Sequence, residues 1–475
     1  MIEVTCFKGE TVGVFGLARS GLSAIRALTA GGATVFAWDD KESARPEAAR
    51  LGATLAMWED WPWAQVKALI LSPGVPLTHP QPHPIVRRAQ EAGAEVIGDI
   101  ELFARTIRPA HGMKGVAPVI AVTGTNGKST TTALIGHILK ACGLDAQVGG
   151  NIGRPALDLA APGAKTVYVL EVSSYQVDLS PGLVSDVAIL TNLSPDHLDR
   201  HGSLDAYRAV KERLLTQAAP DAYVVVGVDD PDSAVIYTRL AATRGPNACA
   251  VSVGKVLGRG IFVIDGKLYD AWDQPSAQMG DLKAAAHLPG AHNWQNAALA
   301  YATLRRMVRD PPAIVAAIAR FPGLAHRIED VGRIGKVRFI NDSKATNADA
   351  AARALACFSD IFWIAGGKPK QGGIADLVPY FPKLRRAYLI GEAADAFGRT
   401  LAGRVDAVQA GTLERALNVA WEDARQSDAP EPVVLLSPAC ASFDQFRDFE
   451  HRGDVFREMV KAMIESQPLP KEALA

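Results

Sequence analysis

The chain has 475 residues, of which 48% are hydrophobic, and this predicts about two to four domains that each bury a core. Its 50 basic and 51 acidic residues balance, so we expect no chain-wide attachment to nucleic acid or to an anionic membrane. Five scattered cysteines without a CxxC pair argue against a disulfide framework or zinc cluster, and with no signal-peptide pattern and no apolar run of about 18 residues they predict a cytoplasmic protein without membrane insertion.

The first part of the chain alternates between apolar runs and helical patterns, which is typical of a parallel sheet covered by helices. Strands are predicted at 11–15, 34–38 and 69–71, with a helix at 22–30. Glycines after the first strand resemble a dinucleotide-binding fingerprint, and Asp39 follows the second strand. The GxGxxG spacing is absent, so the pattern indicates a nucleotide site but counts against NAD.

The Pro- and Gly-rich stretch 109–118 predicts a domain boundary. Beyond it, strands are predicted at the following positions: 119–122, 166–170, 187–190 and 223–226. A second boundary is predicted near 321–323. Further strands are predicted at 337–340, 361–364, 386–390 and 433–436, separated by Ala-rich helices.

The fold class is therefore α/β, with three consecutive domains. We expect a Rossmann-like N-terminal domain at 1–112, a central P-loop ATPase-like parallel sheet at 113–323 and a Rossmann-like C-terminal domain at 324–475.

The strongest motif is the glycine loop Thr123-Gly-Thr-Asn-Gly-Lys-Ser-Thr130, which lies between a predicted strand and a helix at 131–140. This geometry points backbone N–H groups at one anion, Lys128 can reach the outer phosphates of ATP, and the Ser129 hydroxyl can bind Mg²⁺. The usual pattern has a glycine where this chain has Val122, so the loop is a variant. Its predicted ATP-binding residues are Gly124, Thr125, Asn126, Gly127, Lys128, Ser129 and Thr130.

Two other predicted strands of this domain also end in polar residues, Glu171 and the segment that holds His197. Ligands of open parallel sheets bind at the carboxyl ends of strands, so Glu171, His197 and Ser129 could converge on one site. Carboxylate and hydroxyl oxygens suit Mg²⁺, whereas His197 could equally be a cap or loop residue. Asn293 and Asn296 precede an Ala-rich helix, which either could cap.

The last domain has polar loops after several strands. Arg327 could fork onto a γ-phosphate, and Asp342 follows the strand 337–340. Lys370 offers a cation for a side-chain carboxylate, and Thr346 and Ser442 offer hydroxyl donors, which together favour an acidic amino acid as a ligand.

TGTNGKST at 123–130, INDSKATN at 340–347 and SPACASFDQF at 437–446 resemble the Mur ligase superfamily, and among its members those that add D-glutamate. The resemblance implies ATP-dependent ligation of D-glutamate to UDP-N-acetylmuramoyl-L-alanine through an acyl phosphate, in peptidoglycan precursor synthesis. It also implies two Mg²⁺ ions and a carbamylated Lys211, which composition alone would place on a helix surface. We expect a monomer.

The resemblance assigns further residues by motif. Those expected to act on the reacting groups are Lys128, Glu171, His197, Lys211 and Arg327, and the metal set is Ser129, Glu171, His197 and Lys211. Adenine contacts are Asn293 and Asn296, and Arg327 and Asp342 bind the γ-phosphate and ribose. The UDP-substrate residues are Arg19, Ser20, Asp39, Asp40, Ser72, Gly74 and Asn151. The D-glutamate residues are Thr346, Lys370, Ser442, Phe443 and Phe449.

Three alternatives stay open from the sequence. The chain could be a folylpolyglutamate synthetase-like ligase, although about 110 residues precede the loop here. It could add L-glutamate, since sequence does not show stereochemistry. It could also be a P-loop protein that hydrolyses ATP without joining substrates.

Overall fold

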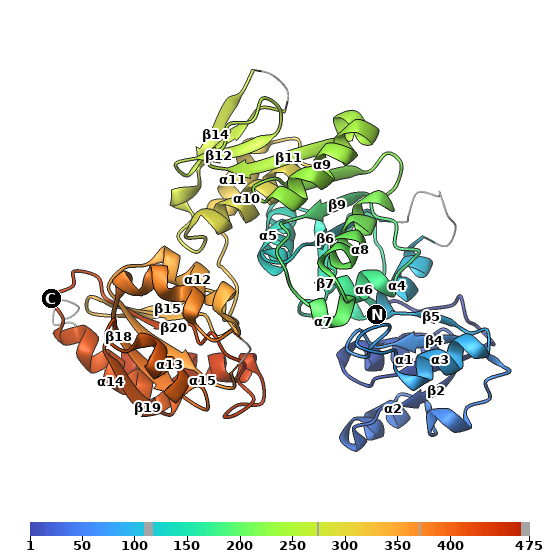
Figure 1. The fold of residues 1–475 in the computed structure, drawn as a ribbon. Coiled ribbons are helices and arrows are strands. Elements are labelled where there is room, and N and C mark those ends of the chain that lie inside the picture. Colours follow the sequence, from blue (N-terminus) through green and yellow to red (C-terminus); the bar gives the residue numbers. More distant parts are fainter. Residues whose placement is uncertain (109–116, 273–274, 370–371, 467–475) are drawn as a thin grey trace. The chain divides into compact units, whose positions relative to one another are not determined.

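The computed structural model describes residues 1–108, 117–272, 275–369 and 372–466. They form two compact units (Figure 1). The first unit comprises Met1–Ala284 with Ala291–Arg320, and the second comprises Ala285–Gly290 with the chain from Phe321 onward. The described residues build three sheets, two in the first unit and one in the second, which agrees with the predicted α/β class. The predicted domain limits themselves stay a prediction.

The first sheet is parallel throughout and has the order β3-β2-β1-β4-β5. Its strands are β1 (Thr11–Phe15), β2 (Thr34–Trp38), β3 (Thr54–Leu55), β4 (Val66–Leu71) and β5 (Glu95–Ile97). Its helices are α1 (Arg19–Ala30), α2 (Arg45–Arg50), α3 (Pro84–Glu91) and α4 (Asp99–Ile107). The predicted strands at 11–15 and 34–38 are confirmed at both ends, because each is an apolar run bounded by turn residues.

The second sheet has the order β14-β13-β12-β11-β10-β9-β6-β8-β7. Its strands are β6 (Val119–Thr123), β7 (Asp145–Gly150), β8 (Thr166–Glu171), β9 (Val187–Leu190), β10 (Tyr223–Gly227), β11 (Ala248–Val253), β12 (Ile261–Ile264), β13 (Lys267–Asp270) and β14 (Ala277–Asp281). It is parallel from β7 to β12, and β13 and β14 then add antiparallel. The sequence did not predict this antiparallel end.

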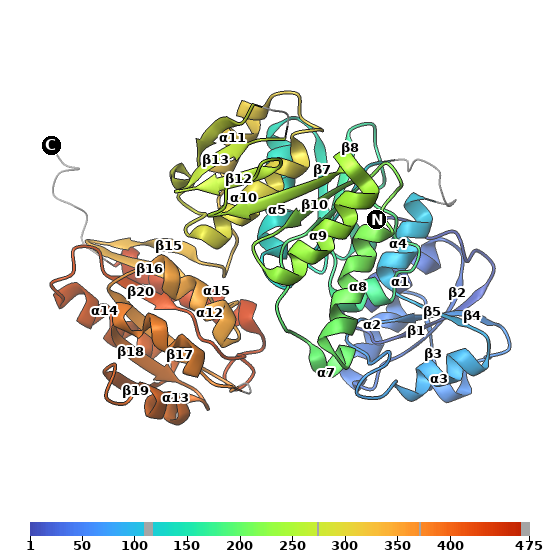
Figure 2. The same cartoon turned by 45° about the horizontal axis from the view of Figure 1, so that its top comes forward.

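Helices of the middle region connect and cover this sheet. They are α5 (Lys128–Ala141), α6 (Ser174–Asp178), α7 (Leu198–His201), α8 (Leu204–Thr216), α9 (Pro231–Arg244), α10 (Ala291–Leu304) and α11 (Pro311–Ala319). Three of them, α5, α10 and α11, pack against one another (Figure 2). This places the start of α10 beside the glycine loop that precedes α5.

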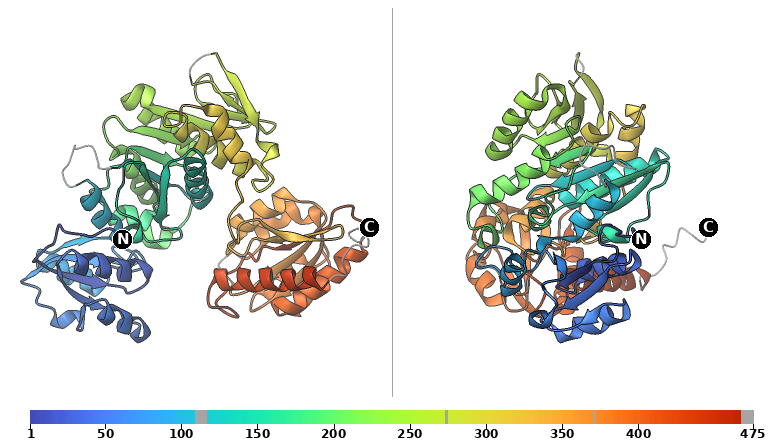
Figure 3. Two further views of the ribbon diagram at one scale, coloured as in Figure 1. Left: turned by 180° about the vertical axis from the view of Figure 1, so that it is seen from behind. Right: turned by 90° about the vertical axis from the view of Figure 1, so that its right-hand side faces the viewer.

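The third sheet has the order β15-β16-β20-β17-β18-β19, with only β15 antiparallel to its neighbour among the described strands. Its strands are β15 (Glu329–Ile334), β16 (Val337–Asn341), β17 (Ile361–Gly366), β18 (Leu384–Ile390), β19 (Ala407–Gly411) and β20 (Val433–Leu436). Its helices are α12 (Ala348–Cys357), α13 (Ala394–Leu401), α14 (Leu413–Gln426) and α15 (Phe449–Glu465). The C-terminal helix α15, in red, packs on β15 and β16 (Figure 3).

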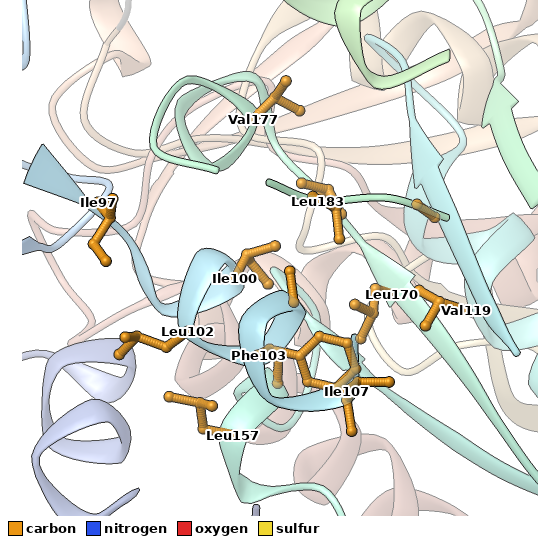
Figure 4. Packing of buried hydrophobic residues seen from close by; sticks show 14 of the residues in the cluster. Ile97, Ile100, Leu102, Phe103, Ile107, Val119, Leu157, Leu170, Val177 and Leu183 are labelled. Carbon is orange, nitrogen blue, oxygen red and sulfur yellow. The ribbon is translucent and has the colours of Figure 1, made fainter. Parts of the chain in front are cut away.

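The first two sheets share one apolar core, although the sequence predicted a separate core for each domain. Helix α4 of the first sheet packs its Phe103 and Ile107 beside Val119 and Leu170 of the second sheet (Figure 4). The Phe103 ring meets Tyr168 edge-on, with 5.1 Å between ring centroids. Because burying one such side chain contributes about 1.5–3 kcal/mol, this cluster joins the two sheets into one unit.

Asp99, at the start of α4, is 3% exposed, and neither of its carboxylate oxygens makes a well-formed hydrogen bond within the part of the chain that the structure describes. Burial raises its pKa from 3.8 to about 6, which the neighbouring Ile100 N–H and Gln176 only partly oppose. The folded state therefore favours the protonated acid, and stability falls as pH rises from about 4 through 6.

Asp99→Asn is expected to remove this loss and to unfold with a free energy about 1–3 kcal/mol higher than wild type at pH 7.5, but not at pH 4. Thermal unfolding of both proteins across this range checks the expectation. Parallel pH profiles for the two would contradict it.

Among the described residues, no helix combines the length and the apolar character that crossing a membrane requires.

Candidate functional site

The glycine loop between β6 and α5 has the shape of an anion cradle. Gly124 and Gly127 have φ of 141° and 81°, values that favour glycine. A Cβ on Gly124 would lie 1.9 Å from Thr191 Oγ1, and one on Gly127 would lie 2.3 Å from Asn296 Oδ1. Neighbouring side chains therefore pack closely against the loop, and the N-terminus of α5 follows it directly. The predicted ATP-binding residues of the loop are contiguous, and the last of them, Thr130, lies in the first turn of α5.

Gly127→Ala is expected to weaken ATP binding at least tenfold. The added methyl group must displace the side-chain amide of Asn296, which hydrogen bonds with Thr131 and Asn293 hold in place. Gly143 offers a matched control: its φ is 80°, and an added Cβ would meet no described atom within 4 Å. Both substitutions share the backbone strain of about 1 kcal/mol. Calorimetric titration with ATP compares them, and equal affinities for the two variants would contradict the expectation.

Two lysine side chains meet on the loop. Lys128 Nζ donates to the carbonyl oxygens of Gly124 (2.9 Å) and Thr125 (2.7 Å). Lys211 Nζ, from α8, donates to the same Gly124 oxygen at 2.8 Å and lies 3.4 Å from Thr123 Oγ1. The Gly124 carbonyl oxygen is therefore within hydrogen-bond distance of two lysine Nζ atoms.

The sequence neighbourhood of Lys211 alone would suggest an exposed position on a helix surface. In the structure its side chain is instead buried, at 1% exposed. Burial lowers its pKa well below the ordinary value, and the charge of Lys128 lowers the pKa further. Tyr207, one turn earlier on α8, places its ring 4.8 Å from the Lys211 ammonium and its hydroxyl 3.0 Å from Thr125 Oγ1. The motif search overlooked Tyr207, since a buried helical tyrosine has no sequence signature.

Glu171 ends β8, where it is the register partner of Val122 on β6. Its side chain is 2% exposed, and Oε1 accepts a hydrogen bond of 2.7 Å from Asn151 Nδ2. The other oxygen, Oε2, is buried and has no hydrogen-bond partner among the described residues. A buried carboxylate oxygen in that state is suited to a divalent cation. Ser129, whose hydroxyl is the other predicted oxygen ligand, is also buried.

His197 lies in an exposed turn with a left-handed backbone, φ 53°. Its Nε2 is 3.4 Å from Asp196 Oδ2. Desolvation lowers its pKa, Asp196 raises it, and the charges of Lys128 and Lys211 lower it, so His197 lies in their electrostatic neighbourhood. Within the described part of the chain, no group of three or more His, Cys, Asp or Glu side chains is arranged around a metal position.

Asn293 and Asn296, the predicted adenine residues, lie inside the start of α10. Asn296 Oδ1 accepts a hydrogen bond of 3.2 Å from Thr131 Oγ1, and Asn296 Nδ2 donates to Asn293 Oδ1 at 3.2 Å. Both residues are buried, since Asn293 is 7% and Asn296 is 2% exposed. They brace the phosphate loop and α5, and contact with adenine stays a prediction.

Six of the predicted UDP-substrate residues lie in loops or at a helix start of the first sheet, and the seventh, Asn151, lies beside Glu171 of the second sheet. Asp39 accepts hydrogen bonds from the N–H groups of Leu17 (2.6 Å) and Lys41 (2.8 Å), so its carboxylate shapes the loop after β1. Asp40 lies 3.5 Å from His83 Nε2. The other predicted residues are placed as follows: Arg19 and Ser20 at the start of α1, Ser72 and Gly74 in the loop after β4, and Asn151 beside Glu171.

In the third sheet, Asp342 follows β16 and is 6% exposed. It accepts hydrogen bonds from Ser437 Oγ (2.8 Å) and the Ile328 N–H (3.2 Å). Burial is the main cause that raises its pKa to about 7. Arg327 is half-buried between His326 and Ile328, which both have positive φ.

The predicted amino-acid residues lie in loops of the same unit. Ser442 is buried, Thr346 is half-buried, and the Phe443 side chain is 68% exposed. The Phe449 ring lies at the start of α15 with Lys344 Nζ 3.6 Å from its centroid. The predicted Lys370 lies outside the described residues.

A fully buried arginine, which the motifs did not single out, ties these loops together. Arg452 on α15 donates to the Ser343 carbonyl at 2.8 Å and the Cys440 carbonyl at 3.1 Å, and its Nε donates to Ser343 Oγ at 2.9 Å. It therefore connects INDSKATN with SPACASFDQF. Because Arg452 lies within a helical pattern, its sequence context is typical of a charged residue on the surface.

Comparisons with known proteins agree with this architecture. Family models match residues 10–98 (Mur ligase MurD-like, N-terminal domain), 122–304 (Mur ligase middle domain) and 326–440 (Mur ligase, glutamate ligase domain). The chain is 52% identical to the UDP-N-acetylmuramoylalanine–D-glutamate ligase of Phenylobacterium zucineum, covering 98% of this chain and 99% of that one. It is 51% identical to the enzyme of the same name from Caulobacter sp. strain K31, over the whole of both chains.

Solved structures share the fold. The UDP-N-acetylmuramate-alanine ligase MurC of Thermotoga maritima superposes with a TM-score of 0.60 at 17% identity, covering 96% of this chain and 99% of that one. A UDP-N-acetylmuramoyl-L-alanyl-D-glutamate–2,6-diaminopimelate ligase does so with a TM-score of 0.56 at 18% identity, covering 98% and 94%.

Proposed function

The chain belongs to the Mur ligase family, and we propose that it joins D-glutamate to UDP-N-acetylmuramoyl-L-alanine at the expense of ATP, in cytoplasmic peptidoglycan precursor synthesis. The observation that carries the proposal is the end-to-end identity of about half the residues to ligases of that name. The phosphate loop with its two lysines supports the ATP dependence.

In the proposed reaction, an oxygen of the alanine carboxylate attacks the γ-phosphorus of ATP, the bond to ADP breaks, and an acyl phosphate forms. The amine of glutamate then attacks the acyl carbon, phosphate leaves, and the nitrogen loses a proton. Neither step needs a covalent enzyme nucleophile. The protein contributes positioning and charge neutralisation, for which we assign Lys128 in the first unit and Arg327 in the second.

The residues of the second sheet fit Mg²⁺. Glu171 offers a buried oxygen to which no described residue donates a hydrogen bond, and Ser129 offers a hydroxyl at the loop. When bound, Mg²⁺ neutralises charge on the phosphate oxygens. In more detail, we propose that two Mg²⁺ ions bind here and that His197 and Lys211 complete their set of ligands.

Lys211 is suited to carbamylation, because it is buried and lies by the phosphate loop beside a second lysine. Its uncharged amine would add to CO₂, form an N–C bond and release one proton, which leaves an anionic oxygen ligand. Activity is expected to fall in CO₂-depleted buffer and to return with bicarbonate, whereas Lys211→Ala stays inactive with bicarbonate. Full activity of Lys211→Ala would refute this assignment.

The remaining assignments concern the two substrates and the nucleoside. We assign Asp342 to the ribose, and Asn293 and Asn296 to the adenine. The acceptor substrate is assigned to Arg19, Ser20, Asp39, Asp40, Ser72, Gly74 and Asn151. D-Glutamate is assigned to Thr346, Lys370, Ser442, Phe443 and Phe449.

Release of phosphate by the full-length protein tests the proposal. It should require ATP, Mg²⁺, UDP-N-acetylmuramoyl-L-alanine and glutamate together. Release with ATP alone, at a rate that neither substrate changes, would instead favour a non-ligating ATPase. Release that needs glutamate and a folate, but no UDP-sugar, would favour a folylpolyglutamate synthetase-like enzyme.

A further inference from the structure

Asn192, just after β9, holds the phosphate loop through three hydrogen bonds. Its backbone oxygen accepts from the Thr125 N–H at 2.9 Å. Its side-chain Oδ1 accepts from the Asn126 N–H at 3.0 Å, and its Nδ2 donates to the Asn126 carbonyl at 3.1 Å. Thr191 Oγ1 donates to the same carbonyl at 2.5 Å. Both backbone polar groups of Asn126 are thus held from the neighbouring strand end.

This support matters because the loop lacks a glycine at the position of Val122. A phosphate cradle depends on the direction of its backbone N–H groups, and the two peptide units that flank Asn126 cannot rotate freely, because one is held at its N–H and the other at its carbonyl. Thr125 is held through its side chain as well, since its hydroxyl accepts from the Ser194 N–H at 3.0 Å. The residues after β9 therefore serve as a template for the loop.

The orientation of the Asn192 side-chain amide is supported by the carboxylate of Asp229, to which it is linked through Gln295. Asp229 Oδ2 accepts a hydrogen bond of 2.8 Å from Gln295 Nε2, and the same carboxylate accepts from Ser252 Oγ at 2.5 Å. Because a carboxylate can only accept, Gln295 must turn its oxygen the other way, toward Asn192 Nδ2 at 3.5 Å. This leaves Asn192 Oδ1 facing the Asn126 N–H.

We propose that Asn192 is a positioning residue for the ATP phosphates, and that Asp229 acts through Gln295 to keep the Asn192 amide in its working orientation. Neither residue needs to touch the nucleotide. The inference rests on the proposed ATP-dependent function and adds to it the residues that shape the loop.

The test compares four full-length variants with wild type by calorimetric titration of MgATP and by steady-state kinetics. Asn192→Ala removes both side-chain hydrogen bonds, and Asn192→Asp replaces the donor by a second acceptor facing the Asn126 carbonyl. Asp229→Asn permits the reversed amide orientation. Asn247→Ala is the control, because Asn247 also accepts one hydrogen bond, from Arg306 at 2.9 Å, but lies away from the loop.

Asn192→Ala is expected to raise the Kd and KM for ATP about tenfold, as the loss of two neutral hydrogen bonds implies. Asn192→Asp should raise them further, Asp229→Asn at least threefold, and Asn247→Ala less than twofold. The KM for glutamate should stay within twofold in every variant, which a general loss of structure would not allow. If Asn192→Ala fails to fold, the isosteric Asn192→Asp carries the test.

Asn192 variants that bind ATP within twofold of wild type would overturn the inference. An unchanged Asp229→Asn beside a weakened Asn192→Ala would overturn the part assigned to Asp229. Wild-type protein that does not bind ATP would instead reject the proposed function.

Discussion

Lys128→Ala is expected to lower the rate of ligation by about 10²–10³-fold, the usual cost of removing one group that stabilises transition-state charge. The Lys128 ammonium donates hydrogen bonds to the carbonyl oxygens of Gly124 and Thr125, so its charge is held beside the loop before ATP binds. Initial rates of product formation at saturating substrates measure the effect.

Lys140→Ala is the matched control for this change, because Lys140 lies at the other end of the same helix and is exposed. It should keep the wild-type rate. A Lys128→Ala enzyme within threefold of wild type would show that the ammonium does not act on the phosphates.

Glu171→Gln is expected to lower the ligation rate by a similar factor, about 10²–10³-fold, and to raise the Mg²⁺ concentration needed for half-maximal rate. The amide has nearly the shape of the carboxylate and keeps an oxygen for the 2.7 Å hydrogen bond from Asn151. It removes the negative charge of the carboxylate, whose buried Oε2 has no hydrogen-bond partner in the described ranges of the chain.

Glu212→Gln is the control for this variant, since Glu212, whose side chain is half-buried, forms an ion pair in the same unit with the exposed Arg239. A surface pair of this kind contributes about 0–1 kcal/mol, so activity and Mg²⁺ dependence should both be unchanged. If Glu171→Gln shows the wild-type rate at every Mg²⁺ concentration, Glu171 does not bind the ion.

Most of the strands that the sequence predicted are apolar runs buried on both faces, although the buried strands β11 and β12 were missed. The strands at 187–190 and 433–436 are entirely buried and were predicted to the residue. The strands β13 and β14 were missed because they are short and partly exposed, so they lack a continuous apolar run. The shared core around Phe103 was also missed, since sequence patterns show that a helix face is apolar but not which sheet covers it.

The candidate site shows the same division. The glycine loop and Glu171 could be predicted because strand, loop and helix follow one another along the chain. Lys211 could be chosen only through the family resemblance, since its burial depends on α8 packing over the loop. Asn192 stayed hidden because its hydrogen bonds join residues 66 positions apart. Sequence patterns therefore single out the groups proposed to bind the ligands more readily than the groups that hold the loop in place.

A comparison of D-glutamate with L-glutamate tests the proposed ligase activity most directly. Purified full-length protein is incubated with ATP, Mg²⁺, UDP-N-acetylmuramoyl-L-alanine and either enantiomer, and the products are separated and weighed by mass spectrometry. We expect one added glutamate residue per UDP-sugar, one ADP per product, and product from D-glutamate only. ADP formation without any product of that mass, or equal product from L-glutamate, would contradict the proposed reaction.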